Sequence, residues 1–134
     1  MKTIAIIIAM IVSNYMMAQE NISVTVTHIP TEKGEIMFGL YSEGTFMKAA
    51  PDYHAKSKVE NKSATVVFEN IPEGEYAVAV YQDENGNHRL DFEPSGRPAE
   101  NYGFSNNPVL YGPPQWEDAK FSVKDEPINL EIRF

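Results

Sequence analysis

The chain of 134 residues contains no cysteine. Disulfide bonds and a cysteine nucleophile are therefore excluded, and a domain of this size must rely on packing or on a bound ion for its stability. Basic residues are also scarce, since eleven Lys and Arg stand against nineteen Asp and Glu, which gives a net charge of −8. This acidic balance argues against binding to nucleic acid or to anionic membrane surfaces.

The sequence also lacks the short motifs that mark common catalytic sites. There is no G-x-S-x-G elbow and no glycine-rich phosphate-binding loop. The three histidines have no local zinc-ligand spacing: His28, His54 and His88. The carboxylates that could pair in a small hydrolase are Glu73, Asp83, Asp91 and Glu93. Because loop acids in an acidic protein are usually solvated or bound to metal, we expect a protein without catalytic activity, and the hydrolase is the weaker alternative.

No apolar run is long enough to cross a bilayer as a helix. The longest, residues 4–12, follows the single positive charge of Lys2 and precedes a small residue, Ala18. This arrangement predicts a signal peptide over residues 1–18 and an exported protein, periplasmic or extracellular, with no membrane span after cleavage. Removing Lys2 leaves ten basic residues against nineteen acids, a net charge of −9, on one predicted domain over residues 20–134.

Alternation of apolar and polar residues with period two dominates after residue 20. The inward sets are Ile22, Val24 and Val26; Ile36, Phe38 and Leu40; Ala64, Val66 and Phe68; Tyr76, Val78 and Val80; and Ile128, Leu130, Ile132 and Phe134. His28 falls on the apolar side of the first strand, and Phe121 and Val123 are expected to pair with the last strand. Residues 46–58 favour at most a short helical turn. The pattern predicts an all-β antiparallel Greek-key sandwich of about seven strands.

Segment 83–91 has short oxygen-bearing side chains at alternate positions. With Asp83 as the first position of a calcium loop, Asn85 and Asn87 fall at the third and fifth. Arg89 falls at the seventh, where the backbone carbonyl is the ligand, and Asp91 falls at the ninth. This spacing predicts a structural Ca²⁺ site, with a weak affinity on the order of 0.1–1 mM.

A metal-free hairpin is the alternative for the same segment. His88 stands where a calcium loop needs glycine, and Pro94 stands where it needs an acid. Asn85-Gly86 between alternating segments is also a strong hairpin signal, with residues 78–82 as one strand and 88–92 as the other. Both interpretations remain open at this point.

Aromatic residues cluster near the long segment between Asp83 and Gln115, which is rich in Gly, Pro and Asn. Tyr102, Phe104 and Trp116 could form an exposed platform for a carbohydrate or a peptide. Alternatively, they cap one end of the core.

Several runs resemble a known family. These are Y-A-V-A-V-Y-Q-D-E-N-G-N at 76–87, Y-G-F-S-N-N at 102–107 and W-E-D-A-K-F at 116–121. The chain is similar in them to the DUF2141 family of bacterial exported proteins. The resemblance implies a secreted or periplasmic β-sandwich similar to prealbumin-like and carboxypeptidase-regulatory-like domains, with an immunoglobulin-like fold class, and it implies no known activity. We therefore expect an exported, non-catalytic binding or accessory module, whose partner is a carbohydrate, a peptide or an envelope protein. A purely structural envelope domain is the alternative.

Overall fold

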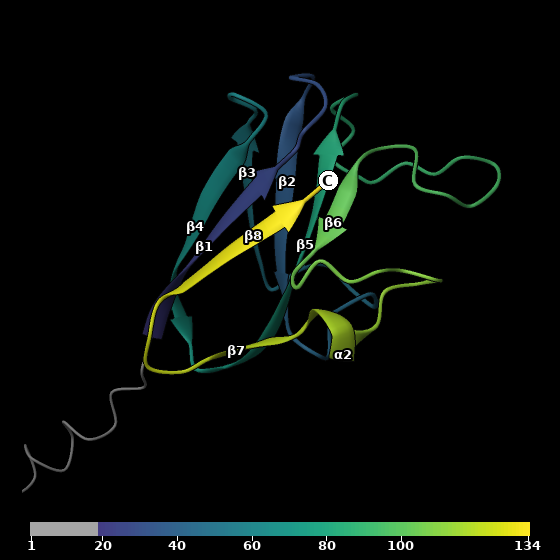
Figure 1. The fold of residues 1–134 in the computed structure, drawn as a ribbon. Coiled ribbons are helices and arrows are strands. Elements are labelled where there is room, and N and C mark those ends of the chain that lie inside the picture. The colour runs from purple at the N-terminus through teal and green to yellow at the C-terminus, as the bar shows by residue number, and fades with distance from the viewer. Residues whose placement is uncertain (1–18) are drawn as a thin grey trace, which may run out of the picture.

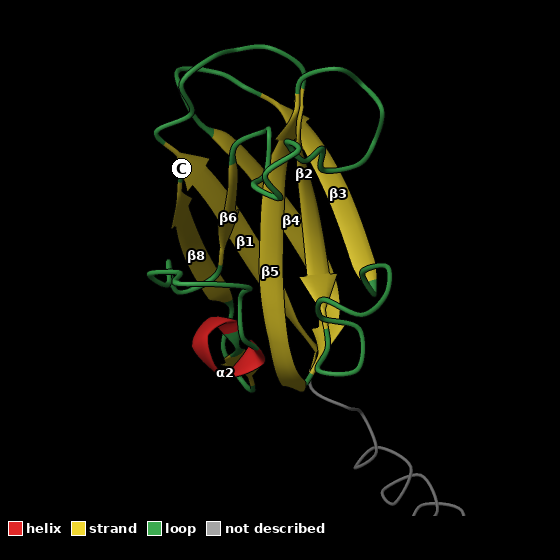
Figure 2. Ribbon diagram, turned by 90° about the vertical axis from the view of Figure 1, so that its right-hand side faces the viewer, coloured by secondary structure: helices red, strands yellow, loops and turns green. Residues whose placement is uncertain are grey.

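The computed structural model describes residues 19–134, which form two β-sheets packed face to face (Figures 1 and 2). The predicted signal peptide lies outside the described residues. The three-stranded sheet has the order β4-β1-β8, formed by Ala64–Pro72, Gln19–Thr27 and Ile128–Arg133. The five-stranded sheet has the order β3-β2-β5-β6, formed by Tyr53–Lys58, Glu35–Tyr41, Gly74–Asp83 and Tyr102–Phe104. Its fifth strand, β7 (Phe121–Val123), pairs with β5.

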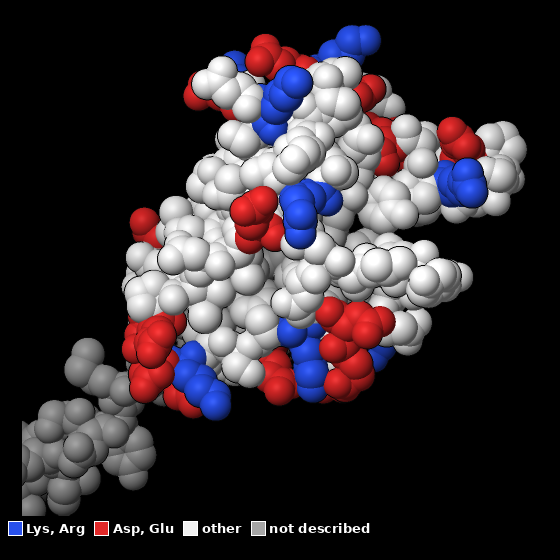
Figure 3. Space-filling model, viewed as in Figure 1, with Lys and Arg blue, Asp and Glu red and all other residues white. Residues whose placement is uncertain are grey.

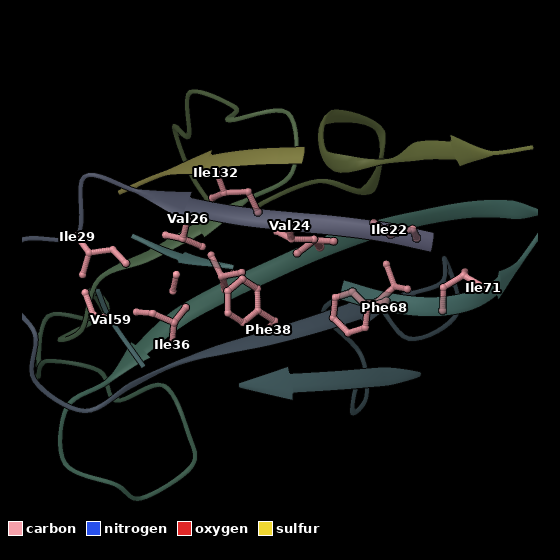
Figure 4. Packing of buried hydrophobic residues seen from close by; sticks show 14 of the residues in the cluster. Ile22, Val24, Val26, Ile29, Ile36, Phe38, Val59, Phe68, Ile71 and Ile132 are labelled. Carbon is pink, nitrogen blue, oxygen red and sulfur yellow. The ribbon is translucent and has the colours of Figure 1, made fainter. Parts of the chain in front are cut away.

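The core lies between the sheets because the apolar residues of each strand alternate as the sequence predicted. Ile22, Val24 and Val26 of β1 are fully buried and lie opposite Phe38 of β2 (Figure 4). Burial of each such side chain stabilises the fold by about 1.5–3 kcal/mol. The prediction of an all-β sandwich with mostly antiparallel strands is confirmed, and residues 19–134 contain eight strands rather than seven.

The strand pairings differ from the prediction in two places. β1 and β8 are parallel, although every other pairing of named strands is antiparallel. β7 pairs with β5 and not with β8, because the four residues that separate β7 from β8 carry the chain across to the other sheet. Parallel neighbours cannot be joined by a tight turn, so the sequence pattern alone could not reveal which strands would meet.

Two strands were missed in the sequence. Residues 53–58 form β3, paired along its length with β2, and the turn before it covers only residues 43–50. β6 lies within the long segment that was expected to lack regular structure. His28 was also misplaced, since it follows β1 with a left-handed φ of 60° and an exposed side chain.

The run at 102–107 connects the five-stranded sheet by hydrogen bonds to Ala119 and to β8. Ser105 is fully buried, and its hydroxyl donates to the Ala119 carbonyl at 2.5 Å and accepts from the Val78 amide at 3.0 Å. The Asn107 side chain accepts from the Arg133 amide and donates to the Glu131 carbonyl. The Asn107 side chain therefore forms the hydrogen bonds with backbone groups at the edge of β8 that a neighbouring strand would otherwise form.

The five-stranded sheet has an outer face, which is turned away from the three-stranded sheet. A second apolar cluster covers the lower half of this face in the orientation of Figure 1. It consists of buried Phe46, Ala77 and Ala119, with Tyr41, Phe104 and Trp116 packed against them. Ala119 belongs to α2 (Trp116–Ala119), a single helical turn. No helix within residues 19–134 has the length and apolar character that a membrane-crossing helix requires.

Candidate functional site

The upper half of that outer face is an open apolar groove of about 510 Å³. Its floor consists of residues that point away from the core: Met37, Gly39 and Tyr41 of β2, Ala79 and Tyr81 of β5, and Tyr102 and Phe104 of β6. The exposed face of an antiparallel sheet normally carries polar side chains. An apolar outer face with this volume is instead typical of a ligand site.

Two loops form the walls of the groove. Met47, Ala50 and Pro51 line one side, and His88, Arg89 and Leu90 line the other. The second wall belongs to segment 84–101, which projects from the sandwich on the same side as segment 106–115 (Figure 1). In Figure 3 the lower projection is uncharged, as its sequence requires, while the upper one carries charges of both signs.

The charge of the groove differs from that of the whole chain. No acidic side chain is among the residues that line it, whereas Arg89, His54 and His88 are. In a protein with nineteen acids, this rim would attract an anionic group on an otherwise apolar ligand.

The three predicted platform residues divide between two environments. Tyr102 and Phe104 line the groove, with ring centroids 5.9 Å apart. Trp116 does not line it, because its ring packs on Phe46 at 5.9 Å in the second cluster. Phe46 also contacts Phe104 at 6.1 Å and Tyr41 at 6.0 Å, so it is the buried centre of the aromatic group. The sequence does not predict this role of Phe46, because Phe46 lies in a turn without periodicity.

The predicted calcium loop is a compact turn next to the groove. Asn85 and Asn87 both donate to the carboxylate of Asp91, at 2.6–2.9 Å. Their side-chain oxygens accept from the backbone amides of Asn87 and Arg89. Asp83 is 3% exposed and accepts from the His88 amide at 2.9 Å. Four of the five predicted residues thus form the turn by their side chains, and the fifth, Arg89, is among the residues that line the groove.

No three His, Cys, Asp or Glu side chains within residues 19–134 converge as a metal site. The turn has a different set of oxygen donors, because two of its four side chains are amides. Calcium accepts carboxylate, amide and backbone carbonyl oxygens alike.

The hairpin interpretation of this segment is wrong. β5 pairs with β6 through Tyr81 and Tyr102, and the Gln82 amide donates to the Asn101 carbonyl. The edge of β5 with which residues 88–92 would have to pair in a hairpin is therefore occupied by β6 and Asn101. Phe92 instead bridges to Pro98 within a small hairpin of its own, and Phe92 is 62% exposed.

Two polar residues that support the turn were not predicted. The Glu100 carboxylate accepts from the backbone amides of Glu84 and Asp91, which joins both ends of the turn. Gln82 is fully buried and donates to the carbonyls of Thr31 and Lys33. The inward position of Gln82 in the alternation of β5 was a usable signal for a buried polar anchor, whereas nothing in the sequence marked Glu100.

The four carboxylates considered for hydrolysis do not form one group, although Asp83 and Asp91 both belong to the turn 83–91. Glu73 precedes β5 and Asp83 ends it, so the length of a ten-residue strand, about 30 Å, separates them. Glu93 is exposed on the small hairpin. A pair for acid and base catalysis must flank one bond, within about 10 Å.

Tyr81 in the groove has a raised pKa. Burial, together with the nearby charges of Asp83 and Glu100, raises the pKa of Tyr81 to about 12. The folded state therefore holds the phenol proton more tightly than the unfolded state does.

We expect the phenolate absorbance of the folded protein to contain one tyrosine that ionises near pH 12, and Tyr81→Phe to remove that step. The stabilisation from this proton is complete below about pH 10 and is lost as the pH rises through 12, because only the unfolded state releases the proton in between. Wild type should lose stability over this range more steeply than Tyr81→Phe. A Tyr81→Phe titration that matches the wild type would contradict the assignment.

A family model described as an uncharacterised protein conserved in bacteria, DUF2141, matches residues 24–131. This range includes β2 to β7, both projecting segments, the last four residues of β1 and the first four of β8, so the chain belongs to that family. The searches of curated proteins and of solved structures found no match.

Proposed function

We infer that this protein is an exported, non-catalytic binding module whose ligand occupies the groove on the five-stranded sheet. The observation that carries this proposal is the apolar outer face between two loops, which the fold leaves open while a second cluster covers the rest of that face. Export follows from the signal predicted over residues 1–18. The Greek-key, prealbumin-like description belongs to the same proposal, supported by the pairing of β1 with β4 and β8.

The groove favours a peptide segment with apolar side chains and a carboxylate. Methionines such as Met37 and Met47 adapt their shape to different apolar side chains. Arg89 on the wall offers a planar pair of donors that match a carboxylate. A carbohydrate would need many more hydrogen-bonding groups than this floor provides.

A peptide array with free carboxyl ends, compared with a glycan array, tests this proposal. We expect the wild type to select apolar peptides that carry a carboxylate. Ala79→Trp fills the floor of the groove and should weaken that binding at least about tenfold, or about 1.4 kcal/mol. Val67→Trp, which adds the same side chain to the exposed face of β4, should bind as the wild type does.

Selection of glycans alone would replace the peptide by a carbohydrate ligand. Failure to bind on either array would favour a purely structural envelope domain instead. Equal binding by Ala79→Trp and Val67→Trp would place the ligand outside the groove and overturn the proposed site.

A further inference from the structure

One buried charged atom of the described chain has no partner. The side chain of Asp83 is only 3% exposed, and its Oδ1 atom is inaccessible to solvent and makes no hydrogen bond. The other oxygen accepts from the His88 amide. The His88 ring lies 3.8 Å away and is 67% exposed, so it neutralises the carboxylate poorly. A buried carboxylate without full compensation is costly, and such sites usually hold a cation or a proton.

The direction of this side chain is set by its neighbours on β5. Gln82 points inward, where it binds the Thr31 and Lys33 carbonyls. Alternation along the strand then directs Asp83 to the opposite, outer face, beneath the chain that follows it. Oδ2 accepts from the amide of His88 in that chain, so the carboxylate, with its free Oδ1, lies against the turn 83–91.

The interior of the turn offers further oxygen donors. The carboxylate of Asp91 supplies two, and the amide oxygens of Asn85 and Asn87 each accept one backbone hydrogen bond, which leaves a second lone pair. Both termini of the turn are fixed on the Glu100 carboxylate. A preformed turn with hard oxygen donors suits calcium better than magnesium, which demands a small octahedral site and keeps its waters.

We propose that the turn 83–91 binds one Ca²⁺ through Asp83, Asn85, Asn87 and Asp91, and that this ion fixes the wall of the groove formed by His88, Arg89 and Leu90. The ion replaces the amide groups of Asn85 and Asn87 as the partner of the Asp91 carboxylate, and it supplies the missing partner of Asp83. The role of the wall rests on the proposed function, whereas the binding of the ion does not.

Thermal unfolding of the full chain with Ca²⁺, Mg²⁺ or a chelator tests the site. At about 10 mM Ca²⁺, with an affinity on the order of 0.1–1 mM, the melting temperature should rise by about 5–10 °C over the chelated protein. Asp83→Asn with Asp91→Asn should abolish the rise. Glu84→Gln with Glu93→Gln removes the same two charges from the same segment outside the turn's donor set, and should keep it. An equal rise with Mg²⁺, or in both double variants, would overturn the proposal as general charge screening.

Trypsin provides a second measurement that requires no groove ligand and no stable variant. Within segment 84–101 the basic residues are Arg89 and Arg97, and the bond after Arg97 is protected by Pro98. Calcium should therefore slow cleavage after Arg89 severalfold in the wild type. The rate of cleavage after Lys62, in the turn before β4, should stay the same. Cleavage after Arg89 that is indifferent to calcium would refute the fixed wall, whatever the peptide array shows.

Discussion

Gly34→Ala should reduce the free energy of unfolding by more than about 4 kcal/mol, a loss that few single substitutions cause. A Cβ on Gly34 would lie 1.9 Å from the carbonyl oxygen of Asp83 and 2.9 Å from the Cα of Glu84. Both contacts are with backbone, which cannot rotate away as a side chain can. The segment that contains Gly34 cannot move away from β5 either, because the Gln82 side chain is hydrogen-bonded to the carbonyls of Thr31 and Lys33 in that segment.

Gly86→Ala is the matched control for this substitution. Gly34 has a φ of 71° and Gly86 a φ of 72°, but a Cβ on Gly86 would meet no atom within 4 Å. The control should lose only the conformational preference of glycine, about 1 kcal/mol. Urea unfolding of the two variants beside the wild type separates the steric clash from the cost of positive φ. Similar losses in both variants would show that the contact between Gly34 and β5 is looser than described.

Ser105→Ala should cost about 2–4 kcal/mol, the second largest effect that we expect. The fully buried hydroxyl is the partner of the Val78 amide and of the Ala119 carbonyl. Alanine leaves both groups buried without that hydrogen bond, and each orphaned group costs about 1–3 kcal/mol. The removed oxygen is too small to admit a water molecule in its place.

Ser122→Ala makes the same chemical change on an exposed position of β7 and should alter stability by less than about 0.5 kcal/mol. Comparison of the two midpoints in urea gives the difference directly. A Ser105→Ala midpoint equal to that of Ser122→Ala would mean that the run at 102–107 is not a structural anchor. If Ser105→Ala instead lowers stability as expected, Ser105 supports the sandwich, while Tyr102 and Phe104 of the same run line the groove.

Two of the three runs that resemble the family therefore have different roles. The run at 102–107 contributes Tyr102 and Phe104 to the groove, but its serine and asparagines bind backbone groups of β5, α2 and β8. The run at 76–87 contains three of the four oxygen donors of the turn, and Asp91 follows it. The spacing of the side chains predicted the oxygen donors of the turn, because all four lie within nine residues. Residues so close in sequence stay close together in the folded state.

The groove was not predictable in this way. Its floor comes from β2, β5 and β6, and its walls come from turns that show no periodicity. Gly39 and Ala79 carry no chemical signal in the sequence, and they matter only because their small size hollows the floor between larger neighbours. The expectation that Trp116 belongs with Tyr102 and Phe104 failed for a related reason, since Phe46 reaches between them from a distant turn.

Sequence alone determined the class of fold, the inward faces of five strands and the donors of the turn, because each depends on alternation within a few residues. Tertiary structure decided which strands pair, including the parallel β1 and β8 and the β6 that displaces the expected hairpin. It also decided that one half of the outer sheet face is covered and the other half is open. These outcomes depend on contacts between residues from 21 to 106 positions apart, whose energies are set by packing in three dimensions and leave no periodic trace along the chain.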